Sequence, residues 1–249
     1  NGQLVPWKQA TLHVLSHALH YASSVFEGER AYGGVVFKGT EHHQRLHDSG
    51  AILGFKVPYS VAEIDAAADQ LVKANKLREK GIRLMWAPWR RPGPDMAPTR
   101  SKAAGLYMIC TLSKHAAENQ GYQDALMLDY RGLLAEATGA NLFLVQDGKI
   151  HTPTPDCFLD GITRRTVIAL ARRLGIEVIE RHLKPEELAK TQEVFLTGTA
   201  AEVTPVGEVG EHRFVPGRVT KALMDAYAAE VRKPAAQWIP SAAPTSAAA

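Results

Sequence analysis

Apolar and polar residues recur along the chain with two different periods, which predicts a mixture of helices and strands. A period of about 3.6, bounded by capping residues, predicts helices over 40–54, 60–75, 103–120, 163–174 and 220–231. Short runs rich in β-branched and aromatic residues predict strands at 82–87, 125–129, 141–147, 176–181, 194–196 and 203–206. These elements do not alternate in strict βαβ order, so we expect a mixed α/β (α+β) fold.

Several boundaries carry local signals. Ser60 and Glu63 form a capping-box pattern at the start of one helix, and Thr40 is a candidate cap for the helix before it. Asp147-Gly148 predicts a tight hairpin turn, and Asn1-Gly2 predicts a second one at the start of the chain. Gly175 stands where a helix ending at residue 174 needs a left-handed residue.

The periodic pattern changes at two places, which divides the chain into three parts. It stops after residue 75 and is followed by a proline-rich stretch, so we place a domain boundary near Lys80. The chain would then consist of a small N-terminal domain (1–80) and a larger domain (81–234). Residues 235–249 are rich in Ala, Pro and Ser and predict a flexible C-terminal tail.

Composition excludes several classes of protein. The 249 residues are 45% apolar and 22% charged, which is ordinary for a folded chain and unlike a disordered one. The net charge of +3 is small for this length and does not predict nucleic-acid binding. No run approaches the about 20 apolar residues of a membrane span, and no signal-peptide pattern is seen. Cys110 and Cys157 are too few for a disulfide scaffold, so we expect reduced thiols in a cytoplasmic protein.

Common catalytic motifs are missing from the sequence. There is no dinucleotide-binding Gly-x-Gly-x-x-Gly after a strand, no P-loop and no Gly-x-Ser-x-Gly elbow. Histidines at helical spacing (13, 17 and 20; 43 and 47) could bind a metal, but neither group contains the Glu of His-Glu-x-x-His. We therefore interpret them as surface or hydrogen-bonded histidines and expect no metal site.

Two short segments suggest an anion site. Asp160-Gly-Ile-Thr163 precedes a predicted helix, and Thr197-Gly-Thr-Ala200 follows a predicted strand. Either segment could simply cap or turn the chain, but together they could hold a phosphate with backbone amides. A phosphorylated cofactor without kinase or hydride motifs suggests pyridoxal phosphate, which needs a lysine, an acid and an anion cradle. Lys102, near a predicted helix start, is a candidate lysine or else an ordinary surface residue.

Six blocks of sequence, in order, resemble the class IV aminotransferases, pyridoxal-phosphate enzymes of fold type IV, and within them the branched-chain group. The resemblance extends from residue 1 to about 232. The blocks are HALHYASSVFEG (17–28), EHHQRLHDS (41–49), SKAAGLY (101–107), LAEATGANLF (134–143), DGITR (160–164) and LTGTAAEVTPV (196–206). The resemblance implies a two-domain fold like that of D-amino acid aminotransferase, and at least a homodimer.

The resemblance also implies roles for individual residues. Lys102 would be the lysine of the internal aldimine and the base that moves the substrate proton. Glu136 would pair with the pyridine nitrogen and Tyr107 with the phenolic oxygen, whereas Arg45, Ile162, Thr163 and Thr199 would hold the phosphate. The amides of Thr199 and Ala200 would bind the substrate carboxylate, Phe26 would line the side-chain pocket, and Tyr21 would reach a neighbouring subunit's site. Without the resemblance, Phe26, Tyr21 and Glu136 would be interpreted as a core residue, a packed aromatic and a strand-end charge.

The sequence departs from the family pattern at three places. Leu106 stands where members usually have Asn, and Ala140 where they often have Glu. Lys80 runs directly into Gly81, where the family has further strands and an interdomain loop that carry a substrate-binding Arg and Tyr. The chain also begins without Met, so we expect this block to belong to the natural protein and to be absent from the sequence printed above.

The activity implied is ping-pong transamination of Leu, Ile or Val with 2-oxoglutarate. Two alternatives stay open. One is another class IV reaction, that of a D-amino acid transaminase, an (R)-amine transaminase or aminodeoxychorismate lyase. The other is a non-catalytic, truncated homologue that serves as a binding or structural subunit.

Overall fold

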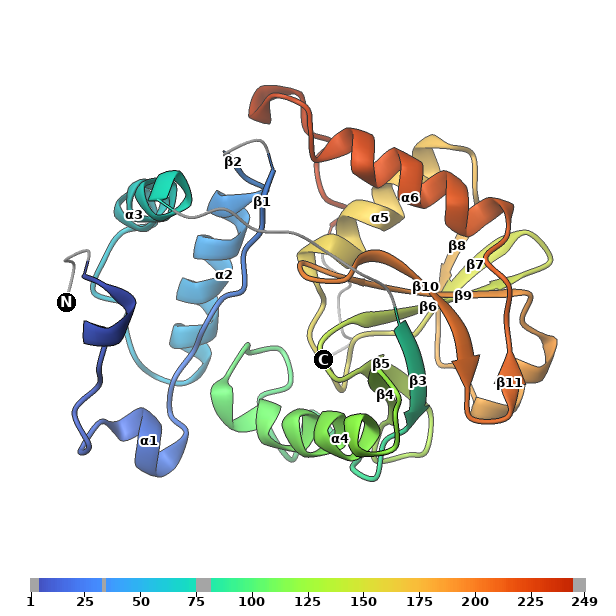
Figure 1. Cartoon of the computed structure of the whole chain (residues 1–249), viewed down its shortest axis with the longest axis horizontal. Coiled ribbons are helices and arrows are strands. Elements are labelled where there is room, and N and C mark those ends of the chain that lie inside the picture. Colours follow the sequence, from blue (N-terminus) through green and yellow to red (C-terminus); the bar gives the residue numbers. More distant parts are fainter. Residues whose placement is uncertain (1–4, 33–34, 75–81, 244–249) are drawn as a thin grey trace.

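The structure is a computed structural model that describes residues 5–32, 35–74 and 82–243. Elements before residue 75 lie on one side of the molecule, and those from residue 82 onwards surround a large sheet (Figure 1). The first group comprises a 3-10 helix (Trp7–Gln9), α1 (His17–Tyr21), α2 (Gly39–Ile52), α3 (Val61–Ala74) and the antiparallel pair β1 (Ala31–Tyr32) and β2 (Val35–Val36). The expected hairpin at Asn1-Gly2, the boundary near Lys80 and the Lys80–Gly81 junction lie outside the described residues.

The second group contains nine strands and three longer helices of the described chain. The strands are β3 (Ile82–Trp86), β4 (Asp124–Leu128), β5 (Leu134–Ala137), β6 (Asn141–Gln146), β7 (Lys149–Thr152), β8 (Val178–Glu180), β9 (Glu193–Gly198), β10 (Glu202–Val209) and β11 (His212–Arg213). The helices are α4 (Met108–Asn119), α5 (Ile162–Arg173) and α6 (Arg218–Glu230), with 3-10 turns at Ala104–Tyr107, Pro185–Lys190 and Ala235–Gln237. The mixed α/β class expected from the sequence is confirmed.

Strand pairing closes part of the sheet on itself. β3 pairs in parallel with β4 and β10, and antiparallel pairs link β4 to β5, β5 to β6, β6 to β9 and β9 to β10. These pairings return to β3 and therefore form a closed ring, from which β7 and β8 extend at one side and β11 at the other. Helices α5 and α6 cover one side of the sheet and α4 lies against the other (Figure 1).

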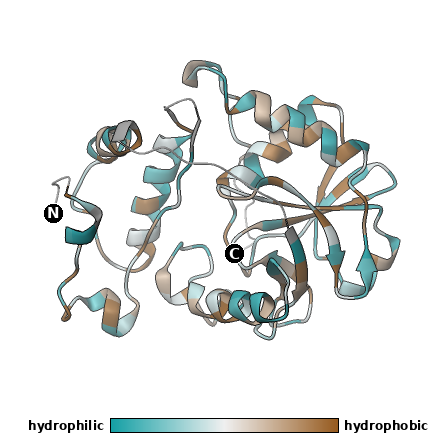
Figure 2. Cartoon of the chain, in the orientation of Figure 1, coloured by the Kyte–Doolittle hydropathy of each residue, from teal (hydrophilic) through white to brown (hydrophobic). Residues whose placement is uncertain are grey.

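The core follows the two-residue period of the strands. Leu142 and Leu144 of β6 face a cluster inside the ring, whereas Phe143 and Val145 face α5 and α6. Phe143 stacks on Phe195 of β9 with 4.9 Å between ring centroids. Because both faces of β6 and β9 are buried, their sequences are continuous apolar runs. Figure 2 shows hydrophobic segments along the central strands.

Local signals were confirmed in three cases and wrong in two. Gly175, directly after the α5 C-cap Leu174, has the predicted positive φ, at +72°. Ser60 and Glu63 form the predicted capping box, with the Ser60 N–H donating to Glu63 Oε2 at 2.7 Å. Asp147 and Gly148 both have positive φ in the tight β6–β7 turn. Thr40 does not cap α2, which begins at Gly39, and its hydroxyl donates instead to Asp65. The helix predicted from residue 103 starts as a 3-10 turn and becomes α-helical only at Met108.

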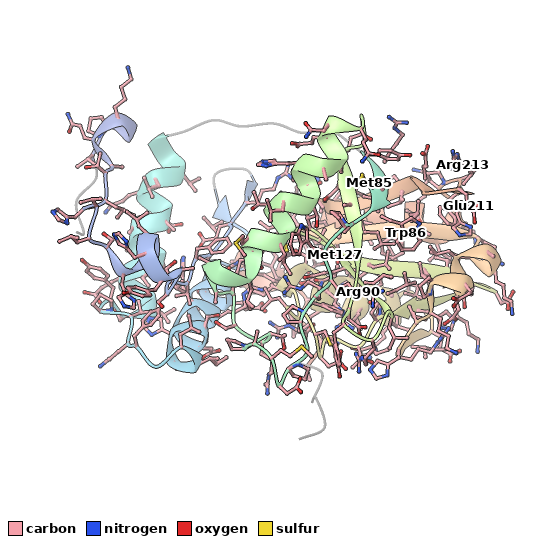
Figure 3. All side chains as sticks on the ribbon, turned by 90° about the horizontal axis from the view of Figure 1, so that it is seen from below. Met85, Trp86, Arg90, Met127, Glu211 and Arg213 are labelled. Atoms are coloured by element: carbon pink, nitrogen blue, oxygen red, sulfur yellow. The ribbon has the colours of Figure 1, made fainter. Side chains whose placement is uncertain are left out.

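The β10–β11 turn packs closely against strand β3. Gly210 has a φ of +54°, and a Cβ atom there would lie 2.6 Å from Nε1 of Trp86, so this position requires glycine. Figure 3 shows Trp86 near Glu211 and Arg213 of the same turn. Within residues 5–32, 35–74 and 82–243, no helix has the length and apolar composition needed to cross a bilayer.

The C-terminal segment differs from the expected flexible tail. Residues 235–243 are folded against both groups of elements, and only 244–249 lie outside the description. Trp238 packs on Phe37 with 5.0 Å between ring centroids, and the buried Lys38 ammonium donates to the carbonyl of Ile239 at 3.0 Å. The prediction rested on the Ala, Pro and Ser content of this segment. Its few large residues, Trp238 and Ile239, nevertheless pack against the core and order it.

Candidate active site

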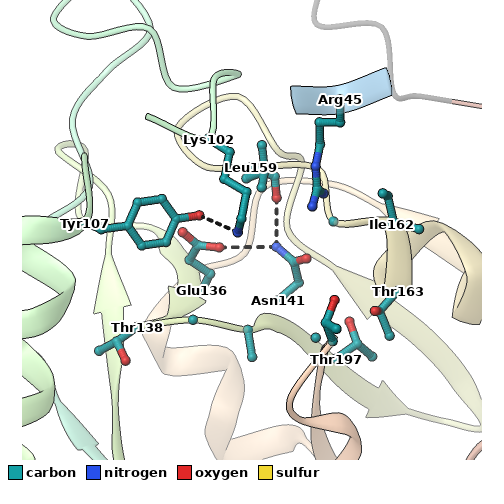
Figure 4. A pocket seen from close by; sticks show the side chains of 15 residues that line it. Arg45, Lys102, Tyr107, Glu136, Thr138, Asn141, Leu159, Ile162, Thr163 and Thr197 are labelled. Carbon is teal, nitrogen blue, oxygen red and sulfur yellow. Dashed lines mark hydrogen bonds between the residues drawn. The ribbon is translucent and has the colours of Figure 1, made fainter. Parts of the chain in front are cut away.

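A pocket opens where α2 faces the loop after β3, the β5–β6 turn, the start of α5 and the end of β9 (Figure 4). Seven residues singled out in the sequence line it together, although they come from widely separated parts of the chain. They are Arg45, Lys102, Tyr107, Glu136, Ile162, Thr163 and Thr199. The fold therefore collects a lysine, a phenol, a carboxyl group and an anion-binding helix end in one place.

Lys102 is held through its main chain as well as its side chain. Its backbone N–H donates to Ser49 Oγ of α2 at 3.1 Å, and its ammonium donates to the Tyr107 hydroxyl at 3.2 Å. Burial and the nearby Arg45 guanidinium lower the pKa of Lys102 below its usual value. A lowered pKa increases the fraction of free amine, the form that attacks a carbonyl carbon.

Glu136 lies on β5 at the base of the pocket. Its Oε1 is 3.3 Å from Nε of Arg91, and its Oε2 accepts a hydrogen bond from the Asn141 amide at 3.3 Å. Burial raises the pKa of Glu136 to about 7, although Arg91 and Lys102 act in the opposite direction. Burial also raises the pKa of Tyr107, which keeps this phenol protonated at neutral pH.

The opposite end of the pocket suits an anion. Arg45 makes a two-pronged ion pair with Glu27, through Nε at 2.7 Å and Nη2 at 2.6 Å, which fixes the plane of the guanidinium. Helix α5 points its N-terminus into the same space, with Ile162 and Thr163 in its first turn. Helix N-termini carry free N–H groups and partial positive charge, so this end fits a phosphate.

Two features of the lining also fit a bound group. The hydroxyl of Thr197 is buried at the pocket without a hydrogen-bond partner among the described residues. A Cβ atom on Gly161 would lie 2.3 Å from Asn141 Oδ1, so any larger residue here would displace the Asn141 side chain or the start of α5. Gly161, and not Thr163, occupies the N-cap of α5, and Thr163 stands in its first turn.

Three predicted residues are not among those that line the pocket. The Phe26 ring is 4.9 Å from the Tyr107 ring between centroids and 5.0 Å from the Lys102 ammonium, so it borders the pocket. Ala200 follows the lining residue Thr199, and its carbonyl accepts a hydrogen bond from Arg30 at 2.8 Å. Tyr21 is 72% exposed and stacks on His17, so it is not part of this chain's own pocket.

The two departures from the family pattern occupy different places. Ala140 lines the pocket and presents only a methyl group there. Leu106 contributes its carbonyl, which accepts a hydrogen bond from Arg91 at 3.0 Å. Neither position supplies a charged or amide side chain to the site.

Sequence reasoning missed several residues that shape the site. Arg91, Ser49 and Glu27 act through Glu136, Lys102 and Arg45, respectively, and Leu159 lines the pocket. Thr197 also lines the pocket and belongs to the Thr197–Ala200 segment that the sequence indicated as an anion site. Asn141 stood inside one of the six blocks but had no role assigned. Arg91 lies in a proline-rich segment without periodicity, so no local signal identifies it. Glu27 and Ser49, in contrast, lie inside two of the six blocks.

These features define an aminotransferase-like site, and comparison with known proteins agrees. The model of the family Amino-transferase class IV matches residues 24–104 and 88–209, and the chain belongs to this family. A probable branched-chain-amino-acid aminotransferase of Rickettsia bellii is 42% identical over 247 residues, covering 84% of this chain and 86% of the relative. The branched-chain-amino-acid aminotransferase of Escherichia coli K12 is 39% identical over 280 residues, covering 91% and 90%.

A solved structure extends the similarity to the fold. It is the branched-chain aminotransferase of the thermophilic archaeon Thermoproteus uzoniensis, solved with norvaline. It superimposes with a TM-score of 0.89 at 32% identity and covers 96% of this chain and 97% of the solved one. The family and fold expected from the sequence are therefore confirmed.

Proposed function

We propose that this protein is a pyridoxal-phosphate-dependent transaminase that moves the amino group of Leu, Ile or Val to 2-oxoglutarate. The observation that carries the proposal is the contact of the Lys102 ammonium with the Tyr107 hydroxyl at 3.2 Å, in a pocket that also holds Glu136 and Arg45. The relatives' names favour the branched-chain substrates over the other class IV reactions. The presence of Lys102, Tyr107, Glu136 and Arg45 in one pocket favours an enzyme over a non-catalytic homologue.

The residues present fit pyridoxal phosphate. Arg45 and the first turn of α5, with Ile162, Thr163 and Thr199, would hold its phosphate, and the unpartnered Thr197 hydroxyl adds a further polar group beside them. Glu136 would face the pyridine nitrogen. When bound, the cofactor supplies an aldehyde that accepts the amino group and a ring that withdraws electrons from the substrate Cα.

Within this arrangement, Lys102 carries out the proton movement. Its amine, kept partly free by burial and by Arg45, would take the proton from the substrate Cα and pass it to the bound cofactor. Tyr107 holds the amine in place through its hydroxyl. The α2 helix and Ser49 restrict the lysine backbone, so only the side chain moves.

Substrate would bind between the β9–β10 turn and Phe26. The backbone amides of Thr199 and Ala200 would hold the carboxylate, and the Arg30 hydrogen bond to the Ala200 carbonyl keeps this turn in position. Phe26, bordering Lys102, would contact the apolar side chain. The apolar ring of Phe26 suits the side chains of Leu, Ile and Val.

We further propose a cytoplasmic homodimer in which Tyr21 of one subunit reaches the other subunit's site. Tyr21 is 72% exposed and lies in a segment with further exposed apolar side chains, including Leu15 at 75% and Leu19 at 59%. Contiguous exposed apolar residues are typical of a protein interface. Cys110 and Cys157 are free, buried thiols, which suits a reducing compartment.

The proposal is tested by the absorbance spectrum of the purified chain with pyridoxal phosphate, before and after adding L-leucine. A visible band that shifts with leucine and is missing from Lys102→Ala supports transamination through Lys102. Lys221→Ala is the matched control, because Lys221 is exposed and pairs only with Asp225 among the described contacts. A wild-type chain without the band, or with one that leucine leaves unchanged, would contradict the proposal. D-leucine and an (R)-amine in place of L-leucine test the other class IV reactions.

A further inference from the structure

Arg91 is a buried arginine that the proposed reaction does not yet use. It lies in the loop after β3, and its backbone N–H donates to the Leu128 carbonyl at 2.8 Å. Its side chain is only 2% exposed, and it is among the largest fully buried side chains of the described chain. Burying a guanidinium is costly unless a carboxylate and hydrogen-bond acceptors compensate it.

The contacts of Arg91 account for this burial and point to Glu136. Nη1 donates to the Leu106 carbonyl at 3.0 Å and Nε to the Cys157 carbonyl at 3.4 Å. Nε also lies 3.3 Å from Glu136 Oε1, which makes Glu136 the carboxylate that balances the buried charge. Two carbonyls hold the guanidinium fixed while its charge faces one oxygen of Glu136.

Asn141 holds the second oxygen of the same carboxyl group. Its side-chain amide has two N–H groups, and Nδ2 donates to Glu136 Oε2 at 3.3 Å and to the Leu159 carbonyl at 3.0 Å (Figure 4). The Leu159 carbonyl thereby fixes the direction of the amide. With one partner on each oxygen, the carboxyl plane of Glu136 has little freedom to rotate.

The charges around Glu136 make its ionisation sensitive to Arg91. Arg91 and Lys102 favour the carboxylate, whereas burial and Asp124 of β4 oppose it. The remaining titratable neighbours, Tyr107 and Cys110, have raised pKa values and are neutral near pH 7. The opposing influences leave the pKa of Glu136 at about 7, where the loss of one positive charge would protonate it.

We propose that Arg91 is a positioning residue that keeps Glu136 ionised in the pocket, and that Asn141 fixes the plane of the Glu136 carboxylate. The inference rests on the proposed function, in which Glu136 faces the pyridine nitrogen of the cofactor. A neutral carboxylic acid can still accept a hydrogen bond, but only the ionised carboxylate also offsets the positive charge of a protonated ring nitrogen. Arg91 therefore acts on the cofactor through Glu136, without touching it.

The test is a pH titration of the Glu136 carboxyl group in the 249-residue chain without cofactor. Infrared difference spectra against Glu136→Gln assign its carboxylic-acid C=O band. As the pH is raised, this band should disappear from the wild-type spectrum with a midpoint near pH 7. Arg91→Met should move the midpoint upward by about one to three pH units. Arg91→Lys keeps the positive charge and should leave the midpoint close to the wild-type value. Asn141→Ala should move it much less, because Asn141 is uncharged.

Each result decides the inference. An unchanged midpoint in folded Arg91→Met would overturn it. If Arg91→Met does not fold, as circular dichroism would reveal, Arg91→Gln tests the same point because it removes the charge and keeps a hydrogen-bond donor. With pyridoxal phosphate added, Arg91→Met should bind the cofactor more weakly than wild type. The dissociation constant should rise by about tenfold for each pH unit by which the Glu136 midpoint moves up. A chain that never binds the cofactor would refute the proposed function, whereas the titration still tests the effect of Arg91 on Glu136.

Discussion

The backbone N–H of Lys102 donates a hydrogen bond to the hydroxyl of Ser49 at 3.1 Å, so helix α2 directly holds the main chain of the lysine. Arg45 lies one helical turn earlier on the same helix and reaches the anion end of the pocket. Residues four apart share a helix face. A single rigid helix therefore sets the spacing between the amine at one end of the site and the guanidinium at the other.

Ser49→Ala should loosen the attachment of the Lys102 main chain to α2. It leaves the partly buried N–H of Lys102 without its acceptor, which costs about 1–3 kcal/mol of unfolding free energy and lowers affinity for pyridoxal phosphate. Ser113→Ala is the matched control, because the Ser113 hydroxyl is equally buried and has no hydrogen-bond partner among the described residues. Urea unfolding and cofactor titration measure both effects. Equal losses in the two variants would show that Ser49 has no special role.

Lys102→Met should stabilise the cofactor-free chain at neutral pH by about 1 kcal/mol, because active-site charges are retained for function at the expense of stability. Burial and Arg45 lower the pKa of Lys102, so the folded chain holds this proton less tightly than the unfolded chain does. The resulting penalty is present below the folded pKa and disappears as pH rises towards 10.5. The stability gap between Lys102→Met and wild type should therefore narrow between neutral pH and about pH 10. A gap independent of pH, or the same gain in the exposed-site control Lys221→Met, would contradict this reasoning.

Glu27→Gln should loosen Arg45 and remove a pH-dependent contribution to stability. Burial acts to raise the pKa of Glu27, but hydrogen bonds from Arg45 and His42 outweigh it and the net pKa is lowered. The contribution of Glu27 is thus complete above its unfolded pKa near 4.5 and is lost as pH falls through the folded value. Wild type should exceed Glu27→Gln by about 2–4 kcal/mol at pH 7, and the difference should shrink in acid. Glu211→Gln, on an exposed turn, should behave as wild type at every pH.

Local chemistry was predictable from the sequence, and contacts between distant segments were not. The Ser60–Glu63 capping box and the Asp147-Gly148 turn depend on residues within three positions of each other, and both were predicted correctly. Strand β5 was missed because its four residues, Leu134–Ala137, are too few to show a period and owe their conformation to neighbours on both sides. The tail at 235–243 was wrong for a related reason, since Trp238 is fixed by Phe37 about 200 positions away.

The candidate site shows the same division. Gly and Thr segments indicated an anion site from the sequence alone, and the resemblance supplied the positions of Lys102 and Glu136. Arg91 could not be found because its partner Glu136 is 45 positions later and nothing near Arg91 requires an arginine. The residues proposed to hold the cofactor all lie inside the six blocks, whereas Arg91, which orients Glu136, was identified only from the fold.

Gly161→Ala should disrupt the site without removing any functional group. The new Cβ atom would lie 2.3 Å from Asn141 Oδ1, so either the α5 N-terminus or the Asn141 side chain must move. Moving Asn141 breaks its hydrogen bonds to Glu136 and Leu159, and moving α5 displaces the first-turn amides of the anion site. We expect a loss of about 1–3 kcal/mol in unfolding free energy and weaker binding of inorganic phosphate and pyridoxal phosphate. Gly28→Ala is the control, because a Cβ atom there meets nothing within 4 Å. Isothermal titration with phosphate and urea unfolding separate the two effects, and a Gly161→Ala chain that matches Gly28→Ala in both would show that the close approach is not required.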